Sequence, residues 1–208
     1  QGNLNDTVRY LIVEKANGDL ERYIETMLYF ADLDDSMQVF DYQLASILTM
    51  IAYTLYVLDD YFDGFVHGDL GPRNVLYVTN LGDMELHYQL NGQNYFIYDD
   101  IEILPKLWDF DKSYLKNVPA QYYDYLSADQ RAREPSPFKE DLSILINKIN
   151  QMIGLRPTQL RFVFDLILSQ AQQLNNKEMA MLFLNSNIVK ELVPSVSRNN
   201  NYVTFAYN

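Results

Sequence analysis

The stretch of sequence that decides the fold runs His67-Gly68-Asp69-Leu70-Gly71-Pro72-Arg73-Asn74. It places a carboxylate, Asp69, five residues ahead of an amide, Asn74. A further carboxylate, Asp109, follows in the stretch Leu107-Trp108-Asp109-Phe110-Asp111. Carboxylate and amide oxygens suit Mg²⁺, because it is a hard ion that keeps some of its waters. Asn74 and Asp109 are therefore candidate metal ligands.

The same residues satisfy the chemical requirements of phosphoryl transfer. This reaction needs a carboxylate for the proton of the attacking hydroxyl, ligands for Mg²⁺, and positive charge against the developing anion. Asp69 is the candidate base, and Arg73 is the candidate cation. Each residue alone is weak evidence, because Asp and Asn often serve as caps or turn residues. These residues follow a predicted buried helix and precede an apolar run that leads into Asp-Phe. This order favours the interpretation that they act together in phosphoryl transfer.

The stretch matches the pattern H-x-D-L-x-x-x-N, and the chain resembles the C-terminal lobe of a protein kinase. The resemblance implies ATP and Mg²⁺ as cofactors. Val13 to Leu20 resembles the hinge, which implies that adenine is held by the backbone of Glu14, Lys15 and Ala16. Phe138 to Leu142 resembles the start of the large central helix, which implies that Asp141 holds the backbone of the catalytic loop.

Several positions depart from the protein kinase pattern. Gly68 replaces the arginine that in many kinases pairs with a phosphorylated activation loop. Gly71 stands where serine/threonine kinases usually place a lysine, whereas Arg73 resembles the tyrosine-kinase arrangement. Asp111 replaces the glycine of Asp-Phe-Gly. The abbreviated pattern is similar to that of divergent kinases of large DNA viruses, and His-Gly-Asp-Leu also resembles small-molecule kinases of the aminoglycoside and choline type.

The resemblance implies that residues 1–208 form a single kinase C-terminal lobe. Residues 1–18 would form a strand and the hinge. Residues 64–134 would carry the catalytic loop, a hairpin insertion and the activation segment, and residues 135–208 would form the C-terminal helices and tail. Nothing ahead of Thr7 matches the Gly-rich loop, lysine or glutamate that the family uses on ATP, so we expect that no N-terminal lobe is encoded.

The resemblance implies phosphoryl transfer to protein serine or threonine when the protein is complete, and an isolated chain that is inactive. The hinge face would be covered by a protein partner, an upstream lobe or a viral assembly. Two alternatives remain open. One is a kinase-derived pseudoenzyme that acts as a binding or virion module, and the other is a small-molecule phosphotransferase.

Hydrophobic periodicity predicts an α+β fold that is mostly helical. Strand-like runs cover residues 7–13 and 74–79, and a hairpin is predicted for 84–90 and 95–98, around Asn91-Gly92. Helices are predicted from Leu20, over 42–59, from Lys139 and over 158–174, and the tail 197–208 is weakly strand-like. We expect the helix 42–59 to pack beside the helix that begins near Asp141.

The amino-acid composition limits which classes of partner the chain is expected to bind. Lys and Arg total 16 against 28 Asp and Glu, for a net charge of -12. This charge argues against binding to nucleic acid or to anionic membranes, which require clustered cations. No apolar run is long enough to span a membrane, and the absence of cysteine excludes disulfides and thiolate metal sites. We expect a cytoplasmic protein, in the host cytoplasm or the virion if it is viral.

Overall fold

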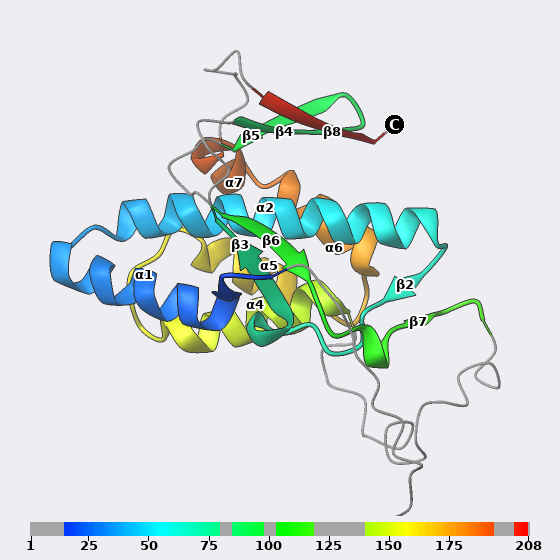
Figure 1. Cartoon of the computed structure of the whole chain (residues 1–208), viewed down its shortest axis with the longest axis horizontal. Coiled ribbons are helices and arrows are strands. Elements are labelled where there is room, and N and C mark those ends of the chain that lie inside the picture. Colours follow the sequence, from blue (N-terminus) through cyan, green and yellow to red (C-terminus); the bar gives the residue numbers. More distant parts are fainter. Residues whose placement is uncertain (1–14, 80–84, 98–102, 119–139, 194–201, 208) are drawn as a thin grey trace, which may run out of the picture.

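The computed structural model describes residues 15–79, 85–97, 103–118, 140–193 and 202–207. Within these ranges the fold is α+β and mostly helical, as the sequence predicts (Figure 1). The predicted strand at 7–13, the hinge residue Glu14 and the segment 119–134 lie outside the described residues.

Two helices begin the described part of the chain. Helix α1 spans Leu20–Asp34 and helix α2 spans Met37–Tyr61. The side chain of Asp19 caps α1 by accepting a hydrogen bond of 3.0 Å from the N–H of Arg22. The predicted helix from Leu20 is confirmed, and the predicted helix 42–59 is extended at both ends in α2.

Within residues 140–193 the structure has four helices: α4 (Asp141–Ile153), α5 (Arg161–Gln170), α6 (Asn176–Leu184) and α7 (Asn187–Leu192). The prediction for 158–174 is too long at both ends, because α5 ends at Gln170. At its start, Asp41 of α2 accepts hydrogen bonds from the Thr158 hydroxyl and the Gln159 N–H. A capping box of Asn175 and Glu178 then begins α6. The sequence predicts α4 beside α2, whereas the helix that packs most extensively along α2 is α6.

Short strands join the two ends of the loop at 67–74 to other parts of the chain. Strand β3 (Val75–Val78) follows the loop and lies between β1 (Gly18–Asp19) and β6 (Leu104–Leu107), antiparallel to both. Strand β2 (Phe65–Val66) precedes the loop and pairs with β7 (Tyr114–Leu115). Two 3₁₀ turns, η1 (Pro72–Asn74) and η3 (Phe110–Lys112), complete this region.

The predicted hairpin is confirmed in strands β4 (Glu85–Leu90) and β5 (Gln93–Ile97). Its turn residues Asn91 and Gly92 both have positive φ, of 51° and 77°. The tail forms β8 (Tyr202–Tyr207), which pairs with β4 in parallel, and this long-range pairing is not predicted by the sequence. In Figure 1 this sheet lies along α2 on the side opposite α1 and α4.

One hydrophobic core joins the helices to the sheet of β4, β5 and β8 and to strands β3 and β6. Its most completely buried side chains include Leu44, Leu48 and Leu55 of α2, Leu145 and Ile149 of α4, and Phe183 of α6. Helices α2 and α4, which lie before and after the loop 67–74 in the chain, are therefore held in place by the same hydrophobic core. No helix in the described ranges is long and apolar enough to cross a membrane.

Candidate functional site

The first residue of α4, Asp141, anchors the loop 67–74. Its Oδ2 atom accepts a hydrogen bond of 2.7 Å from the N–H of His67, and its Oδ1 atom accepts one of 3.0 Å from the N–H of Gly68. The Nδ2 group of Asn176 donates a third, of 2.9 Å. Burial raises the pKa of Asp141, and the hydrogen bonds from His67 and Gly68 oppose that rise. The predicted contact between Asp141 and the loop backbone is confirmed.

Glycine is required at position 68 for a steric reason. Gly68 has a φ of 82°, and a Cβ atom there would lie 2.5 Å from the carbonyl oxygen of Lys112. The hydroxyl of Ser113 donates to the carbonyl of His67 at 3.1 Å. The segment 110–113 therefore packs directly on the start of the loop.

Trp108 connects the segment before η3 to both ends of the loop. The Nε2 atom of His67 lies 2.7 Å from the carbonyl oxygen of Trp108, so Nε2 carries the proton and donates. The N–H of Trp108 donates to the carbonyl of Asn74 at 2.9 Å. Asp109 is the next residue, and therefore lies immediately beside the loop. His67 is fully buried, and its Nδ1 atom has no hydrogen-bond partner in the described structure.

The two predicted metal ligands present free oxygens. The Nδ2 group of Asn74 donates to the carbonyl of Asp69 at 2.8 Å, which leaves its Oδ1 atom without a partner among the described residues. Asp109 is exposed, and its carboxylate makes no hydrogen bond there either. Its backbone is left-handed, with a φ of 63° and a ψ of 61°. Aspartate is one of the residues that adopt this conformation most readily, and Asp35 and Asp63 also have positive φ.

The possible ligands suit a magnesium ion that also binds water and phosphate better than they suit a metal ion bound only by protein side chains. No group of three or more His, Cys, Asp or Glu side chains within the described ranges could hold a metal ion. Mg²⁺ is commonly bound by one or two carboxylates together with waters and substrate phosphates. Asn74 and Asp109 would supply at most two oxygen ligands, so a bound ion would need waters and phosphate oxygens to complete its coordination.

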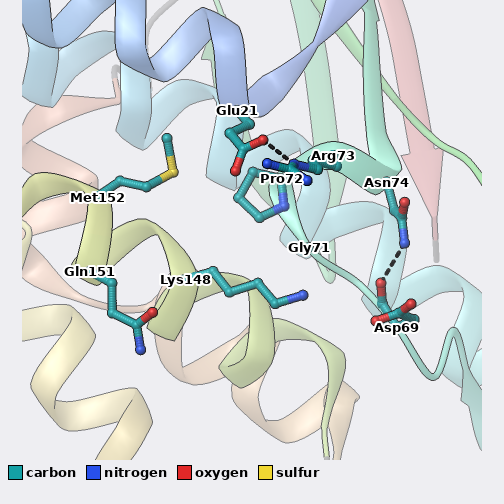
Figure 2. Close-up of a pocket in the computed structure, with 9 residues that line it drawn as sticks. All are labelled: Glu21, Asp69, Gly71, Pro72, Arg73, Asn74, Lys148, Gln151 and Met152. Atoms are coloured by element: carbon teal, nitrogen blue, oxygen red, sulfur yellow. Dashed lines mark hydrogen bonds and ion pairs between the residues drawn. The ribbon is translucent and has the colours of Figure 1, made fainter.

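A cleft of about 550 Å³ lies between α1, η1 and α4 (Figure 2). Three of the predicted site residues line it, namely Asp69, Arg73 and Asn74. The other walls are made by Glu21 of α1 and by Lys148, Gln151 and Met152 of α4. The volume is within the range of ligand pockets.

Of the three predicted adenine-binding residues, the structure describes Lys15 and Ala16. Lys15 is exposed and Ala16 is half-buried, and neither lines the cleft. The next residue, Asn17, donates from its N–H to the carbonyl of Tyr77 at 2.8 Å. This part of the chain is therefore attached to β3, the strand that leaves the loop.

Two ion pairs engage the predicted base and the predicted cation. The Nε group of Arg73 donates to the carboxylate of Glu21, which raises the pKa of Arg73. The ammonium of Lys112 donates to the carboxylate of Asp69, whose side chain is 36% exposed. Asp69 is thus oriented by a cation and remains accessible from solvent.

Neither Lys112 nor Lys148 is among the site residues predicted from the sequence. Lys148 lies seven residues after Asp141 in α4, which places both residues on one face of the helix. That spacing is a signal that could have located Lys148 near the loop. Lys112 has no comparable signal, because its position depends on the tertiary contact between η3 and Gly68.

Comparisons of the chain with protein-family models, with curated proteins and with solved structures find no match. The candidate site therefore rests on its own geometry.

Proposed function

We propose that this chain carries the phosphoryl-transfer site of a protein kinase-like phosphotransferase that uses ATP and Mg²⁺ and transfers phosphate to serine or threonine hydroxyls of proteins. One observation carries the proposal. The buried carboxylate of Asp141 binds two consecutive main-chain N–H groups at the start of the loop 67–74. A buried charge is costly unless it is hydrogen-bonded, so these contacts hold the loop in one conformation.

The residues of the fixed loop take distinct roles in this proposal. Asp69 accepts the proton of the acceptor hydroxyl, and its ion pair with Lys112 orients the carboxylate. Asn74 and Asp109 would hold Mg²⁺ through their side-chain oxygens. When bound, the ion would neutralise charge on the phosphate oxygens. His67 acts as a positioning residue, because its ring ties the backbone before Asp109 to the loop.

A second candidate is a kinase-derived binding module without catalysis. The two ion pairs favour it, since Lys112 occupies the carboxylate of Asp69 and Glu21 occupies the guanidinium of Arg73. In this candidate the paired charges would serve to hold the loop, and a metal–nucleotide complex would have no role.

Binding of Mg-ATP separates the two candidates. Trp108 is the one tryptophan of the chain, and its backbone is bonded to both ends of the loop. Its fluorescence is therefore a local reporter.

The proposal predicts a saturable fluorescence change with ATP that requires Mg²⁺ and is lost in Asp109→Asn. The matched control is Asp34→Asn, which makes the same change at an exposed position in α1. A response that does not depend on Mg²⁺, or that survives in Asp109→Asn, would favour the binding module.

A further inference from the structure

Lys148 projects from α4 into the cleft beside the loop (Figure 2). A Cβ atom built on Gly71 would lie 2.5 Å from the Nζ atom of Lys148. The ammonium therefore occupies the space where a side chain at position 71 would begin. Gly71 itself has an extended backbone, with a φ of -131° and a ψ of 169°, which any residue can adopt. A side chain at position 71 would therefore displace the flexible end of Lys148 without straining the backbone.

The cations around the cleft differ in whether they are paired. Arg73 is bound by Glu21, and Lys112 is bound by Asp69. Lys148 makes no hydrogen bond or ion pair in the described part of the chain, although it is half-buried. A partly buried ammonium has lost some of its hydration, and it gains more from an anionic ligand than an exposed one does.

We infer that Lys148 is the phosphate-binding cation of this cleft, in place of Arg73, the cation predicted from the sequence. The inference rests on the proposed function, since it names the residue that would meet the phosphate chain of the nucleotide. The ligand class is a phosphate chain that lies between Gly71 and α4. The net charge of -12 opposes nonspecific binding of polyanions to the rest of the chain, so binding of one would have to be local.

Titration of the whole chain with inorganic tripolyphosphate tests this inference directly, with isothermal calorimetry as the readout. The titration contains no metal ion, so its outcome does not depend on Asn74 or Asp109. Lys148→Met should weaken binding by about tenfold or more, because it removes a charge-assisted contact. Lys190→Met is the matched control, because Lys190 on α7 does not line the cleft and its removal changes the net charge equally. Lys190→Met should change the dissociation constant by less than about twofold.

Two further variants distinguish phosphate binding from a structural role for Lys148. Arg73→Met should weaken binding less than Lys148→Met does, since Glu21 already engages the guanidinium. In the Lys148→Met background, Gly71→Lys should recover part of the lost affinity, because it brings an ammonium to the same side of the cleft from the loop. A purely structural lysine would not be replaced in this way.

Three results would overturn the inference: no binding of tripolyphosphate to the wild-type chain, equal affinities of Lys148→Met and Lys190→Met, or no recovery with Gly71→Lys. The proposed function fails separately, if Asp109→Asn leaves Mg-ATP binding unchanged. A large effect of Lys148→Met alongside no effect of Asp109→Asn would leave an anion-binding cleft without the phosphotransferase.

Discussion

The main-chain N–H of His67 lies 2.7 Å from the Oδ2 atom of Asp141, 74 residues further along the chain. This contact joins the loop 67–74 to the first turn of α4, and both of its atoms are buried. The position of the loop is therefore set by a tertiary contact.

Asp141→Asn tests the strength of this anchor. The amide oxygen can accept from one of the two N–H groups, whereas the new amide nitrogen would face the other as a second donor. We expect a loss of about 1–3 kcal/mol in the free energy of unfolding, measured by urea denaturation. The exposed Asp34→Asn serves as control. Equal stability of the two variants would show that the anchor contributes nothing.

Gly68→Ala tests the close approach of Lys112 to the loop. Gly92→Ala is the matched control, because Gly92 has a similar φ of 77° and an added Cβ there would meet nothing within 4 Å. Both variants carry the backbone cost of a positive φ, and only Gly68→Ala adds the clash. The free energy of unfolding should fall by about 1–3 kcal/mol more in Gly68→Ala than in Gly92→Ala. Similar losses in both would mean that η3 moves freely away from the loop.

The C-terminal strand β8 gives a prediction about pH. Asp60 accepts hydrogen bonds from the ammonium of Lys177 and from the hydroxyl of Tyr207, and these contacts lower its pKa from 3.8. A carboxyl group whose pKa is lower in the folded state stabilises fully above its unfolded value and loses this contribution as the pH falls through the folded value.

Asp60→Asn should therefore lower the melting temperature at neutral pH. The difference from wild type should shrink as the pH falls below about 3.8. Thermal denaturation at several pH values measures both, and Asp34→Asn again controls for the loss of one charge. A difference that grows as the pH falls would contradict the assigned direction of the pKa shift.

Measurements of kcat should distinguish Arg73, which is paired with Glu21, from the residues that act on the phosphate. In any preparation that transfers phosphate, Asp69→Asn and Asp109→Asn should each lower kcat by about 10²-fold or more. Arg73→Ala should lower it far less, because Glu21 already binds the guanidinium. Rates near wild type in either Asp variant would show that the loop is vestigial.

The sequence predicts the long elements of the fold well. Helices α2 and α4 have 25 and 13 residues, which is long enough for a clear apolar periodicity. The Asn91-Gly92 pair specifies the two-residue turn of the hairpin. Helices α6 and α7 were missed because they have only 9 and 6 residues, which is too short for a clear period. The parallel pairing of β8 with β4 depends on a contact between distant segments, which local pattern does not encode.

Only part of the candidate site could be predicted from the sequence. Asp69, Arg73 and Asn74 were identified by spacing and do share a cleft. Spacing alone does not tell which charges are paired, so the engagement of Arg73 by Glu21 was not foreseen. The position of the Lys148 ammonium beside Gly71 likewise depends on how α4 packs against η1.

The most direct test of the central claim is paramagnetic broadening of backbone amide NMR signals by Mn²⁺ in the presence of ATP. Mn²⁺ prefers the same oxygen ligands as Mg²⁺ and reports even weak binding at the residues near it. The account predicts that broadening is strongest at the amide signals of Asp69, Asn74 and Asp109. In Asp109→Asn this local broadening should disappear, whereas in Asp34→Asn it should remain. Broadening spread evenly over the acidic surface, or unchanged in Asp109→Asn, would contradict the claim that the loop 67–74 and Asp109 form a metal–phosphate site.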